Sequence, residues 1–369
     1  MWIGFILTLL VVLGLVAWTA WHFWLILPCS IAGKWLLTGL YLLSFLLIFP
    51  HYALERKMPL WLATATYEWG NSWMIFFLYA VLLFAVLGLG RLVHLVPASF
   101  LKDSLAGTLT VVGILALLLT YGGFHYKHKY REELEIRTEK PLDKPLTLVL
   151  ASDLHVGYHN RKAELDRWVR LINAEKPDLV LFGGDIIDRS LRPVREGHME
   201  EEFQRIEAPV YACLGNHEYI SGENGSEDFY ALAGIHLLRD SSVVAKGIRL
   251  IGRDDRSNPR RAALSELAPA DTLFTLLLDH QPHHLEEAQL SGVDFQFSGH
   301  THHGQVWPLN WVTDAIFENA FGASRRGDTQ YYVSSGLGIW GGKFRIGTRS
   351  EYIVLHLLPQ SDPKDASIR

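Results

Sequence analysis

The chain has 369 residues and a formal net charge of −5 at pH 7, with 49% apolar and 20% charged residues. This slightly acidic balance argues against a broad basic surface that grips nucleic-acid phosphates, so no nucleic-acid partner is expected. The two cysteines, Cys29 and Cys213, provide neither a disulfide framework nor a thiolate metal site. The length is sufficient for two domains, each with its own core.

The first part of the chain is very apolar, and almost all the charged residues follow Lys127. A helix needs about 20 apolar residues to cross a bilayer. Four segments approach or exceed this length: residues 2–27, 31–49, 73–96 and 105–121. They lack the polar face of a soluble helix bundle, and the first lacks the basic leader and the cleavage site of a signal peptide. We therefore predict a transmembrane domain of four helices at residues 1–123, with the lipid bilayer as its partner.

The basic residues beside these helices predict on which side of the membrane the second half of the chain lies. With four crossings, the N-terminus and the second half of the chain lie on the same side of the membrane. Five basic residues fall on that side and three on the other, which favours a cytoplasmic second half of a multi-pass protein. Residues 124–145 are charged and are interrupted by Pro141 and Pro145, a pattern that predicts a juxtamembrane linker.

The pattern changes at Leu146, where short apolar strands begin to alternate with polar segments. Strands are expected at residues 146–151, 179–182, 209–214, 249–251, 273–278, 295–298, 331–334 and 352–358, with a helix at 163–174. This alternation predicts an α/β domain at residues 146–369. Polar residues directly follow the early strands, where an open sheet collects its ligands at the carboxyl ends.

Five of these strand ends carry residue types that bind metals. They are Ser152-Asp153-Leu154-His155, Gly183-Gly184-Asp185-Ile186-Ile187-Asp188-Arg189, Gly215-Asn216-His217-Glu218, His280, and Gly299-His300-Thr301-His302. Residues i and i+2 of an extended turn point the same way, so Asp153 and His155 can reach one ion. Each fragment alone is equally consistent with a structural turn, but five in succession at strand ends favour a metal site.

The order D-x-H, G-D-x-x-D, G-N-H-E, H, G-H-x-H resembles the calcineurin-like metallophosphoesterase superfamily over residues 146–358. Longer strings at 215–219, 298–306 and 334–338 are similar to the subgroup of the bacterial YkuE-like and YaeI-like phosphoesterases. That subgroup includes transmembrane proteins with a metallophosphoesterase domain, and the apolar first half agrees with them. The resemblance implies a four-helix transmembrane domain followed by an α/β metallophosphoesterase domain, whose two mixed β-sheets are sandwiched between helices.

The resemblance also implies a binuclear centre of two divalent metal ions. The ligands would be Asp153, His155, Asp185 and His302 for the first ion and Asp185, Asn216, His280 and His300 for the second. In this scheme the carboxylate of Asp185 bridges the two ions. The mixture of carboxylate, amide and imidazole ligands suits Mn, Fe or Zn better than Mg or Ca.

His217 follows the ligand Asn216 and would face the substrate rather than a metal. As an imidazolium it could stabilise the phosphoryl oxygens and protonate the leaving alkoxide, a catalytic role. Asp188 is expected to orient a ligand or His217. Arg189 is expected to grip a phosphate oxygen of the substrate, with pairing to Asp188 as the alternative. His303, where relatives often have glycine, is a candidate substrate contact or an exposed loop histidine.

Together these residues predict a membrane-anchored hydrolase of phosphomonoesters or phosphodiesters, with a metal-bridging hydroxide as nucleophile. A lipid or lipid-linked substrate is favoured because tethering raises the effective concentration toward membrane substrates. The resemblance includes hydrolases of UDP-diacylglucosamine, so a pyrophosphatase of that type is an alternative. A non-catalytic metal-binding sensor or scaffold is less favoured, because every expected ligand position is filled. The long segment 308–329 is expected to cap the site, to touch the bilayer or to be an ordinary surface loop.

Overall fold

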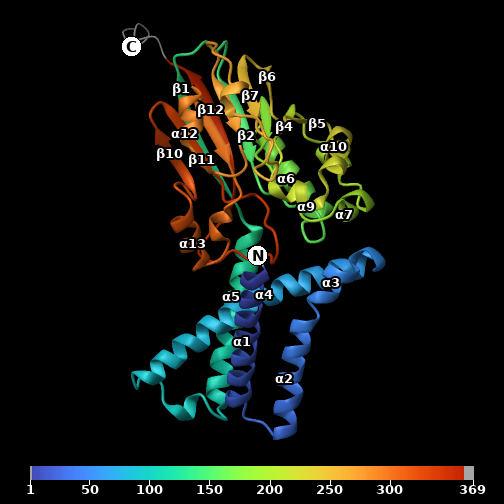
Figure 1. The fold of residues 1–369 in the computed structure, drawn as a ribbon, viewed down its shortest axis with the longest axis vertical. Helices are drawn as coiled ribbons and strands as arrows, with labels where there is room; N and C mark the ends of the chain where they lie inside the picture. The colour runs from blue at the N-terminus through green and yellow to red at the C-terminus, as the bar shows by residue number, and fades with distance from the viewer. Residues whose placement is uncertain (1, 361–369) are drawn as a thin grey trace. The chain divides into compact units, whose positions relative to one another are not determined.

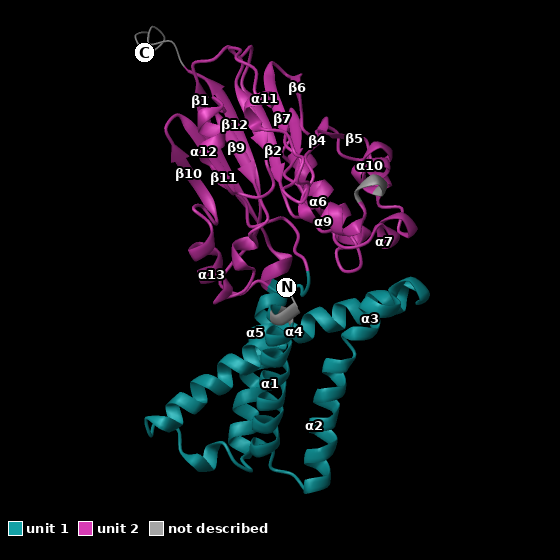
Figure 2. Ribbon diagram, in the orientation of Figure 1, with its two compact units in different colours: residues 1–124, 341–344 teal, residues 125–340, 345–369 magenta. Residues whose placement is uncertain are grey.

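The computed structural model describes residues 2–360, and the chain divides into two compact units (Figure 2). The first unit comprises the chain up to Phe124 together with Gly341–Phe344. The second comprises His125–Trp340 and the chain from Arg345 onward. Each unit has buried apolar clusters of its own.

The first unit is helical. Its helices are α1 (Trp2–Ile26), α2 (Ile31–Leu46), α3 (Phe49–Leu54), α4 (Leu60–Leu92) and α5 (Leu105–Lys127), with short 3₁₀ turns η1 (Glu55–Lys57) and η2 (Ala98–Phe100). Four stretches are long and apolar enough to cross a membrane: residues 6–26, 31–57, 60–92 and 105–127. Val16, Ile48 and Trp73 form a buried cluster among these helices. The structure thus contains the four apolar helices that the sequence predicts.

Two of these helices are longer than the apolar runs that predict them. Helix α4 begins at Leu60 rather than near residue 73. Glu68 and Asn71 interrupt the apolar run but not the helix, and the buried side-chain amide of Asn71 donates to the carbonyl of Tyr67, one turn earlier. Helix α5 continues to Lys127, into the segment expected to be a linker. Hydropathy therefore places these helices correctly but misses their ends.

The second unit contains two mixed six-stranded sheets, with strand orders β1-β12-β2-β3-β4-β5 and β10-β11-β9-β8-β7-β6 (Figure 1). The strands of the first sheet are β1 (Lys129–Thr138), β2 (Leu146–Ala151), β3 (Leu179–Phe182), β4 (Val210–Ala212), β5 (Ile235–Leu237) and β12 (Ser350–Pro359). Those of the second are β6 (Ser241–Ala245), β7 (Ile248–Gly252), β8 (Thr275–Leu278), β9 (Phe295–Ser298), β10 (Gly322–Arg326) and β11 (Thr329–Val333). Strands β2 to β5 run parallel to one another, as do β7, β8, β9 and β11.

The helices of the second unit lie outside the two sheets, on their outer faces or at their ends (Figure 1). They are α6 (Lys162–Ala174), α7 (Leu191–Glu196), α8 (Glu200–Phe203), α9 (Asn216–Ser221), α10 (Glu223–Leu232), α11 (Leu264–Leu267), α12 (Glu286–Leu290) and α13 (Leu309–Ile316), with the 3₁₀ turn η3 (His302–Gly304). Alternate residues of a strand point to opposite faces. Accordingly, Leu148 of β2 joins the core between the sheets, whereas Val149 packs in the cluster that contains Trp168 of α6. The predicted fold of two mixed sheets between helices is confirmed.

The segment expected to be a linker, residues 124–145, contains strand β1. This strand pairs in parallel with β12 along its whole length, from Lys129 opposite Ser350 to Thr138 opposite Pro359. Its residues alternate between exposed and covered positions, and Ile136 is fully buried in the core between the sheets. A charged sequence can form such a strand because only one of its faces meets the core. The segment is therefore part of the sheet rather than only a connection.

Four strands were not expected from the sequence: β1, β5, β6 and β10. Each is the outermost strand of its sheet. An edge strand has a hydrogen-bonding partner on one side only and is more exposed than a central strand. The alternating half-buried and exposed residues of β6, and the largely exposed residues of β10, reflect this position. Such strands lack the continuous apolar run that identifies a buried strand.

The position of β1 predicts where the second unit can be cut. A chain that begins at His125 should fold on its own, whereas one that begins at Pro141 should aggregate. The shorter chain loses buried Ile136, a loss worth about 2–5 kcal/mol, and it exposes the hydrogen-bonding edge of β12. Size-exclusion chromatography and circular dichroism of the two purified chains measure the difference. Equal yields of folded monomer would show that β1 is dispensable.

Candidate metal centre

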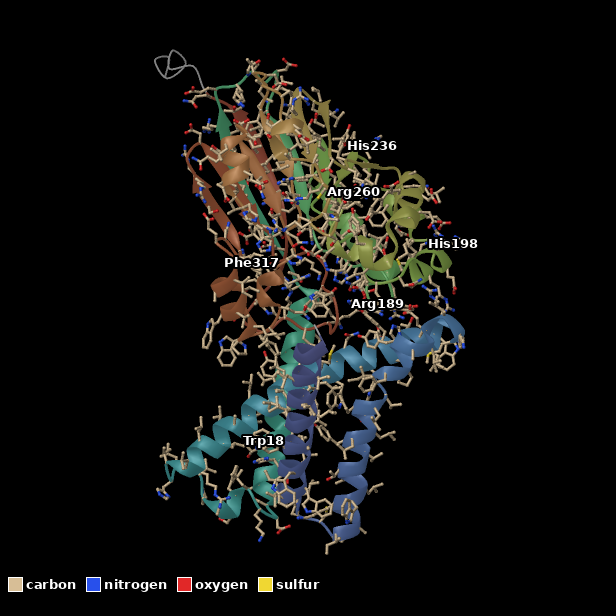
Figure 3. The ribbon with its side chains drawn as sticks, viewed as in Figure 1. Trp18, Arg189, His198, His236, Arg260 and Phe317 are labelled. Atoms are coloured by element: carbon tan, nitrogen blue, oxygen red, sulfur yellow. The ribbon has the colours of Figure 1, made fainter. Side chains whose placement is uncertain are left out.

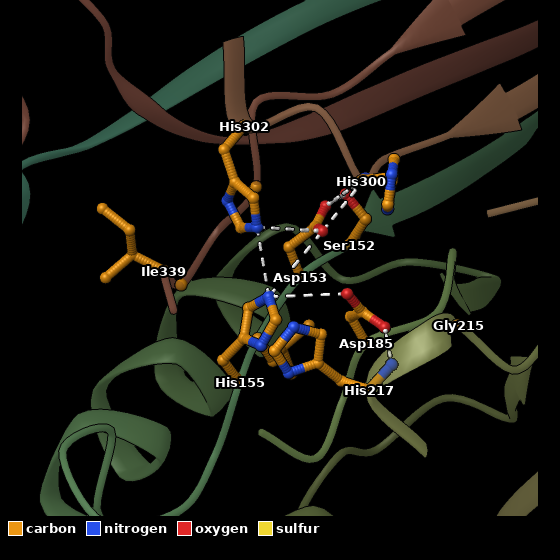
Figure 4. Close-up of polar contacts among 12 residues, drawn as sticks. Ser152, Asp153, His155, Asp185, Gly215, His217, His300, His302 and Ile339 are labelled. Atoms are coloured by element: carbon orange, nitrogen blue, oxygen red, sulfur yellow. Dashed lines mark hydrogen bonds and ion pairs between the residues drawn. The ribbon is translucent and has the colours of Figure 1, made fainter. Parts of the chain in front are cut away.

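The predicted site residues lie on loops that follow five strands of the second unit. Three loops follow the parallel strands β2, β3 and β4 of the first sheet, and two follow the parallel strands β8 and β9 of the second. Because the carboxyl ends of parallel strands lie at one edge of a sheet, each sheet presents its loops together. The loops of the two sheets meet, and their polar side chains converge (Figure 4).

Five of the predicted ligands have a left-handed backbone conformation. Their φ angles are 53° for Asp153, 46° for His155, 51° for Asp185, 71° for His300 and 49° for His302. This conformation costs a residue with a side chain on the order of 1 kcal/mol or more. Backbone hydrogen bonds between neighbouring loops hold these turns in place. The backbone N–H of Asp153 donates to the carbonyl oxygen of Gly184, and that of His155 donates to the backbone carbonyl oxygen of Asp185, both at 3.0 Å. Strain of this kind is typical of functional sites.

Two glycines allow the backbone to approach the carboxylates closely. A Cβ atom at Gly215 would overlap the carboxylate of Asp185, and one at Gly299 would overlap that of Asp153. The N–H of His300, next to Gly299, donates to both carboxylate oxygens of Asp153 at 3.0 and 3.2 Å. Gly215 and Gly299 are therefore required for space around these two carboxylates.

Three groups of side chains each place one ligand atom per residue within 4.8 Å of one another. They are Asp153, His155 and His302; His155, Asp185 and His217; and Asp185, His280 and His300. The first group contains three residues predicted for one ion, and the third contains three predicted for the other. Oδ2 of Asp185 lies 3.7 Å from Nε2 of His155 and 3.1 Å from Nε2 of His280, between these two groups. The ligand roles themselves stay a prediction.

The first group is entirely buried. Nε2 of His155 and Nε2 of His302 face each other at 3.1 Å, and Nε2 of His302 lies 3.4 Å from Oδ1 of Asp153. The other oxygen of Asp153 accepts a hydrogen bond from the Ser152 hydroxyl at 2.6 Å. Two imidazole nitrogens and one carboxylate oxygen thus converge on one point, which is a donor set that suits a transition metal.

Asn216 lies next to the third group, that of Asp185, His280 and His300. Oδ1 of Asn216 lies 2.8 Å from Nδ1 of His300. Nδ1 of His280 lies 2.7 Å from the carbonyl oxygen of Gly183, which leaves Nε2 directed at Asp185. Among the described residues, this buried Nε2 makes no hydrogen bond. A buried nitrogen without a hydrogen bond, fixed from behind by a carbonyl, fits a metal ligand.

The buried carboxylates attract positive charge. Burial lowers the pKa of His155, but the carboxylates beside it outweigh burial and raise the pKa to about 10. Burial also opposes a charge on His280, yet Asp185 raises its pKa well above the usual value. In contrast, burial and the charge of His280 lower the pKa of His300 to about 4. A divalent ion that binds here competes with the protons that the carboxylates favour on His155 and His280.

His217 and Asp188 lie beside the convergent ligands. The N–H of His217 donates to Oδ1 of Asp185 at 2.8 Å, and its ring is 4.4 Å from that of His155. Burial opposes a charge on His217, but Asp185 outweighs burial and raises the pKa of the imidazole. Oδ1 of buried Asp188 lies 3.3 Å from Nδ1 of both His155 and His217. This carboxylate is placed to orient either ring.

Arg189 and His303 lie outside the three groups. Arg189, which Figure 3 labels, follows Asp188 in the chain and is half-buried. The ring of His303 stacks on Phe321 at 4.6 Å, and its Nε2 lies 3.5 Å from Oδ1 of Asp314 in helix α13. The substrate roles of Arg189 and His303 stay predictions.

Glu218 has a role that the sequence did not reveal. Its buried carboxylate accepts hydrogen bonds from the backbone N–H groups of Asp185, Ile187 and Gly215, at 3.1, 3.0 and 2.7 Å. The hydroxyl of Tyr230 donates to it at 2.7 Å. One side chain thus holds the loops after β3 and β4 together. The sequence did contain one signal for this role, because Glu218 is the last residue of the string Gly215-Asn216-His217-Glu218.

Arg345 was missed completely. It is fully buried and donates to the carbonyl oxygens of His302 at 2.7 Å and of Gly338 at 3.3 Å, as well as to that of Ser335. Burial lowers the pKa of its guanidinium to about 10. The fixed fork of donors ties the loop that carries His302 to the loop before β12. No motif in the sequence marks this arginine.

Comparison with known proteins agrees with this geometry. The calcineurin-like phosphoesterase family matches residues 146–304. An uncharacterized metallophosphoesterase of Helicobacter pylori is 31% identical over 271 residues, covering 70% of this chain and 73% of that protein. One of Aquifex aeolicus is 30% identical over 237 residues, covering 61% of this chain and 90% of that protein.

The class of protein follows from three findings: the fold, the convergent histidines and carboxylates, and these similarities. The chain belongs to the calcineurin-like metallophosphoesterases and is a metal-dependent phosphoesterase. It is also similar to a Danio rerio protein named transmembrane protein with metallophosphoesterase domain, at 26% identity over 345 residues, which cover 86% of this chain and 76% of that protein.

The network at Glu218 predicts a local effect. Glu218→Gln should speed hydrogen exchange in a peptide covering residues 183–188 by about tenfold or more. The reason is that the NH2 group of glutamine would replace a carboxylate oxygen that now accepts hydrogen bonds from backbone N–H groups. Tyr230→Phe is the matched control, since it keeps all three backbone bonds. Exchange measured by mass spectrometry should remain slow in the control. Equal protection in the Glu218 variant and the unsubstituted protein would contradict this role.

Proposed function

We propose that this protein is a membrane-anchored two-metal hydrolase of phosphoesters. The observation that carries the proposal is the carboxylate of Asp185, which lies between two groups of histidines. Two cations held close together need a shared anionic ligand. Asp185 belongs to the group with His280 and His300, and its Oδ2 lies 3.7 Å from Nε2 of His155 in the other group, so its carboxylate can serve as this bridge.

The ligand sets we propose are those that the sequence predicts. They are Asp153, His155, Asp185 and His302 for one ion and Asp185, Asn216, His280 and His300 for the other. Two such ions would activate a water molecule and neutralise charge on the phosphoryl group. Nitrogen-rich ligands favour Mn, Fe or Zn over Mg or Ca.

The chain's own residues then supply binding and proton transfer. His217 is 16% exposed at its side chain, more open than its buried neighbours, and the charge of Asp185 outweighs burial and raises the pKa of its imidazole, which favours the protonated ring. It can therefore hold a phosphoryl oxygen and give a proton to the leaving alkoxide. Asp188 fixes the ring by its contacts to Nδ1, so that Nε2 is free for the substrate. Arg189 is proposed to grip a phosphate oxygen as the substrate enters.

The apolar helices support a membrane anchor. Four helices are long and apolar enough to cross a bilayer, and the count of basic residues favours a cytoplasmic catalytic domain. Tethering favours a lipid or lipid-linked phosphoester, because it concentrates the enzyme at membrane substrates. A pyrophosphate bond of the UDP-diacylglucosamine type is the second candidate, since the same charge arrangement would serve it.

The bridging role of Asp185 predicts the effect of one substitution. Asp185→Asn should lower the metal content of the purified protein below one ion per chain and reduce hydrolysis of a chromogenic phosphodiester to background, because no anionic bridge remains. Metal content is measured by plasma mass spectrometry. Arg189→Ala is the control and should retain its metal. Two ions per chain in the Asp185 variant would defeat the assignment.

The role of His217 predicts a dependence on the leaving group. His217→Ala should lower kcat for an alkyl phosphoester by about a hundredfold to ten-thousandfold, the usual contribution of a general acid. The loss should shrink for a nitrophenyl ester, whose leaving group departs without a proton. Metal content should not change.

Two results would correct this role for His217. A uniform loss across leaving groups would show that the ring mainly holds phosphoryl oxygens. A loss of metal would show that His217 is itself a ligand, as its position in the group with His155 and Asp185 permits.

A further inference from the structure

The second unit has a concentrated apolar surface on and before helix α13. Among its described residues, ten large apolar side chains are exposed, and five of them fall within residues 307–316. They are Trp307, Leu309, Trp311, Val312 and Ile316, with exposed fractions of 42%, 40%, 62%, 52% and 62%. The other five are scattered singly along the chain, as is normal for a soluble surface. We call these five side chains between Trp307 and Ile316 the α13 face.

The α13 face has the form of an amphipathic helix turned outward. Leu309, Val312 and Ile316 recur at i, i+3 and i+7, so they share one side of the helix. The rings of Trp307 and Trp311 contact each other at 5.4 Å. None of the residues of α13 is buried. An ordinary amphipathic helix would turn its apolar side toward the core, whereas this one presents it to the surroundings.

Helix α13 is attached directly to the metal-centre loops, and it lies at the same end of the sheets as α9 (Figure 1). Asp314, on the other side of the helix, contacts His303, and the hydroxyl of Thr301 donates to the carbonyl of Ala320 at 2.6 Å. Phe317 directly follows α13 (Figure 3), and its ring lies 6.0 Å from that of His300 and 4.8 Å from that of His283. The α13 face and the metal centre therefore belong to one connected part of the unit.

We propose that the α13 face lies in the interfacial layer of a lipid bilayer and presents the metal centre to phosphoesters of membrane lipids. Tryptophan side chains favour the headgroup region, and an outward apolar helix face buries itself in the acyl boundary. The chain itself supplies the membrane: α5 is long and apolar enough to cross it, and a single residue separates α5 from β1. The bilayer is thus within reach of the unit by covalent connection alone.

This inference rests on the proposed hydrolase function only for the identity of the substrate. Phe317 gives the rim of the centre an apolar ring next to His300, which suits the glycerol or acyl part of a lipid phosphoester. A water-soluble phosphoester would gain nothing from the α13 face. The position of the face in the membrane can be tested without any substrate.

The test uses the full chain in vesicles of phosphatidylcholine and phosphatidylglycerol. Cys29→Ser removes the exposed native cysteine, while Cys213 is buried. A fluorophore is then placed on Val312→Cys or, as a matched control, on Leu290→Cys, which is 83% exposed in α12 of the same unit. Phospholipids with brominated acyl chains should quench the label at 312, and aqueous iodide should quench the label at 290.

The quenching result can overturn the proposal in two ways. A label at 312 that iodide reaches as readily as the label at 290 would place the α13 face in water. Protection of the label at 312 from both quenchers would mean that protein covers the face, either the rest of this chain or a second copy. In either case the bilayer is not its partner.

The activity of surface variants tests the substrate separately. The double variant Trp311→Ser/Ile316→Ser should hydrolyse a phospholipid in vesicles about tenfold more slowly, with unchanged activity on a soluble chromogenic phosphodiester. Leu290→Ser should affect neither reaction. Equal rates on the phospholipid would refute the lipid-substrate inference. If the unsubstituted chain hydrolyses no phosphoester, the proposed function fails, while quenching at 312 still decides where the face lies.

Discussion

The second unit depends on one electrostatic constraint, the burial of three carboxylates that each lie within 3.9 Å of a ring nitrogen of His155. Asp153, Asp185 and Asp188 are almost fully buried, where unpaired anions cost several kcal/mol each. The convergent histidines, the close glycines and the N–H groups that donate to these carboxylates all reduce that cost. The strained turns are tolerated because they bring these partners into place. A divalent cation would neutralise the buried carboxylates more completely than protons on the histidines do.

Two buried charged side chains support the loops of the centre. Glu218 binds the backbone of the loops after β3 and β4, and Arg345 binds the backbone of the loop that carries His302. Both are buried charges that hold other residues' main chains rather than a substrate. Such supporting groups hold functional side chains within the narrow tolerance that catalysis requires. The site is therefore an arrangement of loops, each tied to its neighbour.

The two proposals, a membrane anchor and an α13 face in the bilayer, give the apolar features of both units one common function. Helices α1 to α5 would hold the chain in the bilayer, and the α13 face would orient the metal centre toward lipid headgroups. The connection is local in the structure, since Thr301 and His303 join the His300–His302 turn to the segment around α13. Anchoring and catalysis would then share a few residues next to the metal ligands rather than act as separate properties.

The sequence by itself determined the apolar helices, the central strands and the residue types of the centre, because hydropathy, strand length and motif order are local properties. It did not reveal β1, β5, β6 and β10, whose edge positions make their residues polar or half-exposed. Arg345 escaped notice because its carbonyl partners come from two separate loops, one with His302 and the other with Ser335 and Gly338. Only the tertiary structure decided that Asp185 stands between two histidine groups and that α13 turns its apolar side outward, since both depend on contacts between distant segments.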